Sequence, residues 1–180
     1  MNWDSLVTAR DQWVAKNFPD PHIPDPGESV LGCIEELGEL CHHWLKKAQN
    51  IRGSQEEHDA EMKDAVGDLT IYLLGVMSKR NCRPHGKPIV SLTDETDVLF
   101  RLSRAVGNLA ARQHTTCTEQ VTMITYLLDR FCLKMGWNYE QIVIHTWNHV
   151  KERDWSVNRE DGSPIQLPTS DEQSEYAGGQ

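Results

Sequence analysis

The segment EMKDAVGDLTIYLLGVM, residues 61–77, decides the fold of this chain. In its first half, Glu61, Asp64 and Asp68 are spaced so that all three fall within about 60° on one helix face. The same face continues into Tyr72, and the second half of the segment is apolar almost all round. An acidic stripe that runs into an apolar stripe faces the interior of a bundle or a cleft in it. We therefore predict that this segment is the central, buried helix of an all-α helical bundle.

A second acidic stretch, EELGE at residues 35–39, lies in the preceding helical pattern. Glu36 and Glu39 are about 60° apart on a helix, whereas Glu35 points about 100° away from Glu36 and either faces solvent or approaches a ligand from the side. Buried carboxylates need cations, and hard divalent ions prefer oxygen ligands. A metal site of this kind suggests phosphate chemistry. We predict a site for Mg²⁺, with Mn²⁺ as a possible substitute, formed by Glu36, Glu39, Asp64 and Asp68.

Three other interpretations of these residues stay open. Exposed glutamates most often have no specific role, so the stretches would then be solvated helix surface. A structural Ca²⁺ ion is a second alternative, although the EF-hand loop pattern is absent from the sequence. His43 follows Glu39 by four residues, which makes a transition-metal site conceivable.

Helical periodicity along the whole chain predicts six helices and no strand. Ser54 and Glu57 form a capping-box pattern at the start of the third helix. The proline-rich residues 19–27 are expected to form a loop. We predict one domain over residues 1–155, followed by a flexible polar tail over residues 156–180. The predicted helices span Asp4–Asn17, Ser29–Gln49, Gln55–Lys79, Asp94–Gln113, Thr118–Lys134 and Tyr139–Asp154.

The composition of the chain argues against several classes of binding partner. The chain has 180 residues and a formal net charge of −9, which argues against a partner such as nucleic acid. No apolar run reaches the roughly 20 residues that cross a bilayer, and the N-terminus lacks the pattern of a signal peptide, so no membrane partner is expected. The five cysteines form no CxxC pattern, which favours reduced thiols in a cytoplasmic protein.

Taken together, the acidic stretches resemble the EExxE…ExxD signature of the MazG-like, all-α nucleoside triphosphate pyrophosphohydrolases. This group also includes the dimeric dUTPases and the dCTP pyrophosphatases. The best-matching stretches are residues 32–40 and 61–74. The closing run WNHVKERD, residues 147–154, also resembles the run that ends many small members. The resemblance extends over roughly residues 3–155 and implies a bundle of the MazG-like type.

This resemblance implies hydrolysis of a nucleoside triphosphate to the monophosphate and pyrophosphate, with Mg²⁺ as cofactor. Glu35 or Glu61 would act as the general base. Tyr72, one turn beyond Asp68 on the same face, would contact the sugar or the base of the nucleotide, or would belong to the core instead. The resembling families assemble as dimers or tetramers, so we expect a homodimer or a homotetramer. The residues expected to contact the phosphates are Lys47, Arg52, Asn148 and Lys151.

One departure from the family pattern concerns the second motif. When the sequence is aligned on Gly67-Asp68, the first acidic residue of ExxD falls at Ala65. Either Asp64 and Asp68 replace the usual pair, or Glu61 also contributes, directly or through water. Two other functions therefore stay open. One is a base-selective dUTP or dCTP pyrophosphatase, and the other is a non-catalytic bundle that binds a nucleotide or a partner protein.

Overall fold

A computed structural model describes residues 1–19, 26–111, 116–160 and 162, and these residues form six α-helices and no strand. The all-α fold predicted from the sequence is confirmed. Most of the loop predicted at residues 19–27 lies outside the described residues. The helices are α1 (Trp3–Asn17), α2 (Gly27–Gln49), α3 (Gln55–Lys79), α4 (Glu95–Ala110), α5 (Cys117–Lys134) and α6 (Tyr139–Val150).

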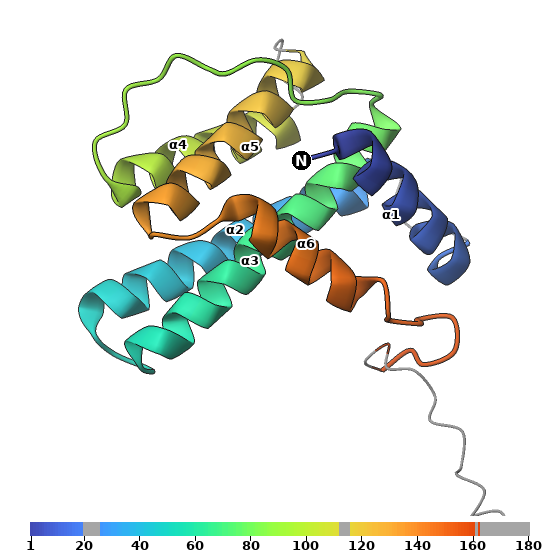
Figure 1. The fold of residues 1–180 in the computed structure, drawn as a ribbon, viewed down its shortest axis with the longest axis horizontal. Helices are drawn as coiled ribbons and strands as arrows, with labels where there is room; N and C mark the ends of the chain where they lie inside the picture. The colour runs from blue at the N-terminus through green and yellow to red at the C-terminus, as the bar shows by residue number, and fades with distance from the viewer. Residues whose placement is uncertain (20–25, 112–115, 161, 163–180) are drawn as a thin grey trace, which may run out of the picture.

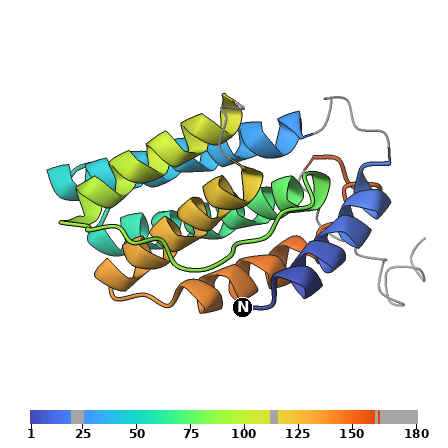
Figure 2. The ribbon, with the colours of Figure 1, turned by 90° about the horizontal axis from the view of Figure 1, so that it is seen from above.

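α3 is the central helix, as its sequence predicts. It packs against α1, α2, α5 and α6, while α4 packs on α2 and α5. Seen from above, α2 and α4 form one side of the molecule and α1 and α6 form the other, with α3 and α5 between them (Figures 1 and 2). Leu69, Leu73 and Leu74 of α3 have no solvent exposure. Full burial of a leucine contributes about 1.5–3 kcal/mol, so the apolar half of α3 anchors the core.

α2 and α3 form an antiparallel hairpin closed by a tight turn (Figure 1). Gly53 in this turn has a φ of 140°, a conformation that favours glycine. The predicted capping box is confirmed: the Glu57 amide donates to Ser54 Oγ (3.1 Å), and the Ser54 amide donates to the Glu57 carboxylate (2.7 Å). The cap fixes where α3 begins, and therefore which residues of α3 face α2.

α6 ends earlier than its periodicity predicts, at Val150 rather than Asp154. The Arg153 amide donates to the Val150 carbonyl (3.1 Å), which is a tighter turn than an α-helix makes. The Asp154 amide donates instead to the carbonyl of Gly162 (2.7 Å), so it cannot extend the helix. The predicted end of the fourth helix, Gln113, lies outside the described residues.

The chain beyond α6 returns to the end of α1. The Trp155 amide donates to Asn17 Oδ1 (2.6 Å), and residues 156–160 form turns. Residues 163–180 lie outside the described residues, so the flexible tail stays a prediction. All five cysteines are free thiols. None of the described helices has the length and apolar character needed to cross a membrane.

Candidate metal centre

The predicted metal ligands lie beside a close contact between α2 and α3. A Cβ atom at Gly32 of α2 would overlap the ring of Tyr72 of α3, so the glycine is what allows this contact. Glu36 lies one turn after Gly32, and Asp68 lies one turn before Tyr72. Because the two helices run antiparallel, Glu36 and Asp68 are brought opposite each other.

Glu36 is the most buried of the acidic residues, with 9% relative exposure. Its pKa is raised to about 8, first by burial and then by the negative charges of Asp68, Glu39, Glu35 and Asp64. The four predicted metal ligands and Glu35 therefore act on one another electrostatically. We refer to these five residues as the acidic cluster.

Asp68 is half-buried and shows the same effect. Its pKa is raised to about 6, first by burial and then by the charge of Asp64, with a smaller contribution from Glu39. The guanidinium of Arg153 acts in the opposite direction and lowers this pKa. A cation from the segment that follows α6 therefore lies near the cluster.

The donor set of the acidic cluster fits a hard divalent cation. Within the part of the chain that the structure describes, no hydrogen bond or ion pair satisfies these carboxylates. No fully buried side-chain oxygen lacks a partner there either, so the oxygens of Glu36 are accessible to solvent. Oxygen ligands with open access suit Mg²⁺. Among the described residues, no group of three or more His, Cys, Asp or Glu side chains is arranged so that it could hold a metal ion as it stands.

The two predicted general bases differ in their position relative to the acidic cluster. Glu35 is exposed, and its charge raises the pKa of Glu36, so it stands at the edge of the cluster. Glu61 is also exposed, but its charge is not among those that shift Glu36 or Asp68. The structure therefore brings Glu35 to the cluster and leaves Glu61 at its periphery.

The burial of Ala65 and the charges near Glu36 bear on the departure from the ExxD pattern. Ala65 is 1% exposed and belongs to the hydrophobic core, so this position faces away from the acidic residues. Asp64 and Asp68 both raise the pKa of Glu36. This placement favours Asp64 and Asp68 as the residues that replace the usual pair.

Tyr72 forms the apolar end of the candidate site. Its ring packs against Gly32 and is half-buried. Its pKa is raised, first by burial and then by the charges of Glu35, Glu36 and Asp68. The tyrosine therefore lies near enough to the cluster to feel its charges.

The residues predicted to contact phosphates lie at two places. Lys47 is ion-paired with Asp59, and Arg52 is exposed in the turn of the hairpin, so both lie at its tip. The tip is about 16 Å along α2 from the buried glutamate of the cluster. Asn148 and Lys151 are exposed at the C-terminal end of α6. The structure thus does not gather these four residues in one place.

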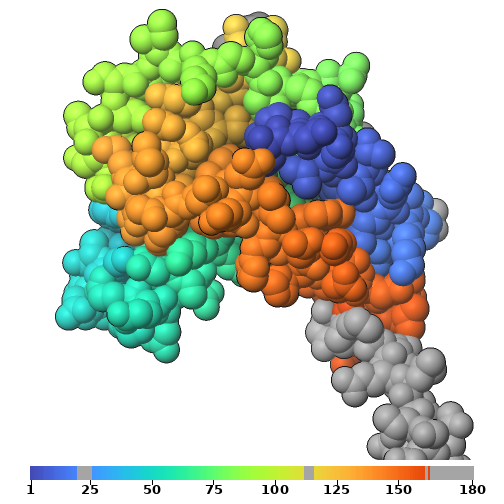
Figure 3. All heavy atoms as spheres, in the orientation of Figure 1, coloured from blue at the N-terminus to red at the C-terminus, as the bar shows by residue number. Residues whose placement is uncertain are grey.

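α6 crosses α3 beside the cluster. A Cβ atom at Gly67 would overlap the side chain of Thr146, so α6 sits directly on α3 next to Asp68. The end of this helix is tied to α1, because Trp13 Nε1 donates to the carbonyl of Arg153 (3.0 Å). The molecular surface is hollowed between the α2–α3 hairpin and the C-terminal end of α6 (Figure 3).

Sequence reasoning missed Arg10 of α1. A Cβ atom at Gly75 would lie 2.7 Å from Arg10 Nη2, so the guanidinium rests directly on α3. Gly75 lies two turns beyond Asp68 on the same helix face. The Arg10 side chain is only 12% exposed and pairs with Asp11 (3.4 Å). The sequence signal was Gly75 itself, since glycine inside a helix costs about 0.5–1 kcal/mol relative to alanine and needs a packing reason.

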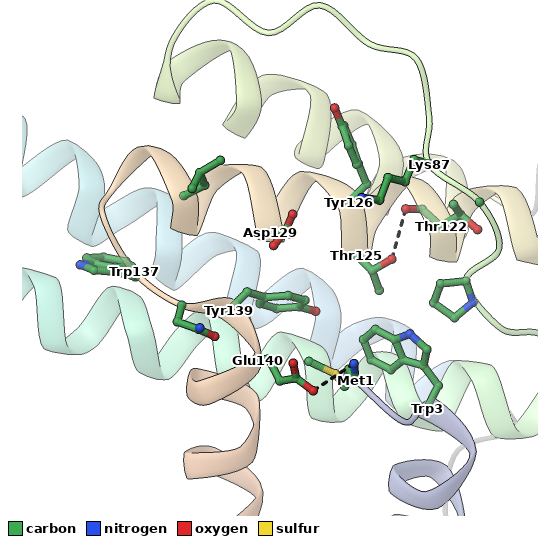
Figure 4. A pocket seen from close by; sticks show the side chains of 14 residues that line it. Met1, Trp3, Lys87, Thr122, Thr125, Tyr126, Asp129, Trp137, Tyr139 and Glu140 are labelled. Atoms are coloured by element: carbon green, nitrogen blue, oxygen red, sulfur yellow. Dashed lines mark hydrogen bonds and ion pairs between the residues drawn. The ribbon is translucent and has the colours of Figure 1, made fainter.

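A separate pocket of about 610 Å³ lies between the start of α1, the segment before α4, and helices α5 and α6 (Figure 4). None of the predicted site residues lines it. Its two acidic residues already have partners: Glu140 pairs with the amino terminus of Met1 (2.9 Å), and Asp129 pairs with Arg130. Its aromatic lining residues are Trp3, Tyr126, Trp137 and Tyr139.

Comparison of the chain with known proteins found no matching protein family, no matching curated protein and no matching solved structure. The family resemblance therefore rests on the two motifs and the closing run.

Proposed function

We propose that this protein is a Mg²⁺-dependent nucleoside triphosphate pyrophosphohydrolase, which converts a (d)NTP to the (d)NMP and pyrophosphate. The observation that carries the proposal is the position of Glu36, a buried carboxylate surrounded by four like charges. Burying charge without a partner destabilises a fold, and a bound cation removes that cost. The resemblance to MazG-like proteins supports the reaction class.

The acidic cluster would divide into ligands and a base. Glu36, Glu39, Asp64 and Asp68 would hold the metal. A bound Mg²⁺ would neutralise the triphosphate and increase the acidity of a coordinated water molecule. Glu35, exposed at the edge of the cluster, would accept the proton of the attacking water, and Glu61 is the alternative base.

Cations around the cluster would bind the phosphates. Arg153 is the best placed, because its charge acts on Asp68. Lys151 and Asn148 precede it at the same end of α6, and Arg10 approaches from α1. These side chains would donate hydrogen bonds to phosphate oxygens and stabilise the charge that develops on the transferred group.

The first test is pyrophosphate release from a panel of canonical and modified (d)NTPs, with Mg²⁺, with Mn²⁺ and with EDTA. We expect metal-dependent release, which the Asp68→Asn variant should reduce by about 100-fold or more. Asp94→Asn is a matched control, because Asp94 caps α4 away from the site and asparagine caps equally well. Turnover that survives EDTA, or is unchanged in Asp68→Asn, would contradict the proposal.

A non-catalytic nucleotide-binding bundle is the second candidate. The observation that favours it is that the acidic residues are not preassembled in the described structure. This alternative predicts nucleotide binding, measured by calorimetry, without pyrophosphate release at any metal concentration. If turnover is found, the same panel distinguishes a broad enzyme from a dUTP or dCTP pyrophosphatase, with Tyr72 as the residue placed to contact the base or sugar.

We also propose that the protein assembles as a homodimer, or as a homotetramer built from such dimers. Large apolar side chains are exposed on α2 and α4: Leu31 is 55%, Leu45 44% and Phe100 72% exposed. Exposed apolar side chains on neighbouring helices are typical of an interface when they gather in one patch. Light scattering that gives a monomeric mass at micromolar concentration would contradict this assembly.

A further inference from the structure

Two histidines meet at the tip of the α2–α3 hairpin, and one of them is buried. His58 of α3 is only 2% exposed, whereas His43 of α2 is partly buried. Their Nδ1 atoms are 3.2 Å apart, and the other ring nitrogen of His58, Nε2, lies 3.0 Å from the carbonyl oxygen of Ile51. The buried ring therefore joins α2 to the turn that closes the hairpin.

These two contacts fix which ring nitrogens carry hydrogen. A carbonyl oxygen only accepts, so Nε2 of His58 must carry a hydrogen and donate it to Ile51. A neutral imidazole has one N–H group, which leaves Nδ1 of His58 as an acceptor. His43 must therefore donate from its own Nδ1, and a single hydrogen lies between the two rings.

The pair can take up one proton without losing this bond, but it cannot take up two. A first proton can bind at Nε2 of His43, which leaves the Nδ1 hydrogen in place and makes the bond charge-assisted. A second proton would have to bind at Nδ1 of His58, which is the acceptor. Two N–H groups on two cationic rings would then face each other at 3.2 Å, so the contact would have to open.

The turn beside the pair has an unfavourable backbone. Asn50 and Arg52 have φ values of 52° and 63°, and Gly53 has a φ of 140°. Residues other than glycine adopt positive φ uncommonly, and these conformations persist only where the surrounding structure holds them. The bond from His58 to Ile51 holds the residue between Asn50 and Arg52. Opening of the ring–ring contact would thus release a strained segment.

The acidic residues on either side of His58 in the chain already have partners. The Asp59 carboxylate is paired with Lys47, and the Glu57 carboxylate accepts a hydrogen bond from the Ser54 amide. Both contacts use negative charge that could otherwise neutralise a second proton on the histidine pair.

The other charged groups at the tip do not bind the pair either. The exposed ring of His42 lies 5.1 Å from that of His43, and the pKa of His42 is lowered, first by desolvation and then by the charges of His43 and Lys46. α4 begins beside the same end of α2 (Figure 2). Within the residues that the structure describes, none of these groups is bonded to either ring of the pair. The remaining charged groups are Glu39, Arg52, Glu56 and Glu61 of the hairpin, with Glu95, Arg104 and the paired Asp97 and Arg101 of α4.

We propose that the His43–His58 pair is a pH-sensitive switch for the turn of the α2–α3 hairpin. At neutral pH the two rings share one hydrogen and hold the turn closed. An unperturbed histidine takes up a proton near pH 6.5, so an open pair gains two protons as the pH falls through this range, whereas the closed pair gains one. Acid therefore favours the open turn, and the closed turn is fully populated only above this range. The switch does not depend on the proposed hydrolase activity.

The test is an NMR titration of the metal-free full chain from about pH 8 to about pH 4.5, a range that spans histidine protonation. The readouts are the ring nitrogen signals of each histidine and amide hydrogen exchange in the turn, corrected for its intrinsic pH dependence. At the start we expect hydrogen on Nδ1 of His43 and on Nε2 of His58. In acid, Nδ1 of His58 should gain hydrogen at the pH at which exchange in the turn becomes about 10-fold faster or more. These readouts are local, which separates them from titration of the acidic cluster.

His43→Asn is the variant that should disable the switch. Asparagine can donate from its amide group, and this group can turn over to present its oxygen to a protonated His58. Exchange in the turn should then no longer respond to protonation of His58. His145→Asn is the matched control and should leave the turn as in the wild type. The rings of His145 and His149 are 4.3 Å apart, but His149 Nδ1 bonds the His145 carbonyl and not the other ring.

Three outcomes would overturn the proposal. The first is hydrogen on Nε2 and not on Nδ1 of His43 at the start of the titration. The second is any separation of the two acid events, or a neutral His58 in a closed turn at the end of the titration. The third is an acid response in His43→Asn equal to that of the wild type. The wild-type titration decides the first two even if the variant does not fold.

Discussion

The α2–α3 hairpin contains two regions that differ in whether their charged and polar side chains have partners. At its tip several polar side chains are paired with one another or with the backbone. Lys47 pairs with Asp59, and buried His58 bonds both to His43 (Nδ1 to Nδ1, 3.2 Å) and to the carbonyl of Ile51 (Nε2 to O, 3.0 Å). Two to three turns away, the acidic cluster has no hydrogen bond or ion pair within the described residues.

The difference indicates what each region is for. Paired groups at the tip stabilise the turn and set the register of the two helices. The same helices could have carried lysine or glutamine beside Glu36, yet they present like charges to one another. Local arrangements that oppose stability are typical of functional sites. The comparison therefore points to the cluster, rather than to the tip, as the part of the hairpin that binds a ligand.

The difference between the hairpin tip and the acidic cluster is tested most directly by replacing one carboxylate of the cluster. Glu36→Gln should lower kcat/KM for the preferred nucleotide by about 100-fold or more, because a neutral amide is a poor Mg²⁺ ligand. The same change should raise the Tm of the metal-free protein, since glutamine needs neither a bound proton nor a buried charge at this position. Steady-state kinetics and thermal melts in EDTA measure the two effects. A variant with lower Tm and normal kcat/KM would reverse the roles assigned to the two regions.

The position of α6 beside the cluster can be tested by changing a residue at its contact with α3. Gly67→Ala should destabilise the protein by about 1–3 kcal/mol, because the added methyl group overlaps Thr146. It should also reduce turnover, since it displaces the end of α6 that carries Arg153. Gly107→Ala is the control: a Cβ atom there has no neighbour within 4 Å, so it should be neutral or slightly stabilising. Urea unfolding gives both free energies.

The pH dependence of the free energy of unfolding is a further test of how the acidic cluster affects stability. The pKa of Glu36 is about 8 in the folded protein, against an ordinary value of 4.5. Between these values the folded protein holds a proton that the unfolded chain has released, so stability should fall as pH rises through this window. The total loss should be on the order of 1–3 kcal/mol after solvent screening. Metal-free urea melts from pH 5 to 8 measure it. Glu36→Gln should flatten the curve above about pH 6, below which Asp68 also titrates, and an unchanged slope there would contradict the assigned cause.

The smallest effect is expected at the tip. Ser54→Ala removes one half of the capping box and should destabilise the protein by about 1 kcal/mol. Turnover should be unchanged, because the cap only sets where α3 begins. A large loss of activity without a matching loss of stability would mean that the tip takes part in the chemistry.

Much of the fold was predictable because local signals determine it. The largely apolar second half of α3 predicted the central helix, and Ser54 with Glu57 predicted where this helix begins. The end of α6 was less predictable. Its periodicity continues to Asp154, but the Asp154 amide bonds to Gly162, a contact that lies outside any helical pattern.

The candidate site was predictable only where one helix determines it. Helical spacing placed Asp64 and Asp68 on one face, but it also placed Glu61 there, and periodicity cannot show that this residue is peripheral. The approach of Arg10 and Arg153 depends on how α1 and α6 pack on α3. Contacts of that kind join residues far apart in the sequence, so the closing run 147–154 contains Arg153 without showing that it approaches Asp68.

The link between α1 and the end of α6 has a consequence for folding. The hydrogen bond from Trp13 to Arg153 spans 140 residues, and the pair between Lys16 and Asp154 spans 138. Closing so long a loop is slow, whereas the α2–α3 hairpin needs only local contacts. The carboxylates should therefore come together early in folding, and Arg153 should join them last. A chain in the course of folding would have the acidic residues of the site before it has the arginine that faces them.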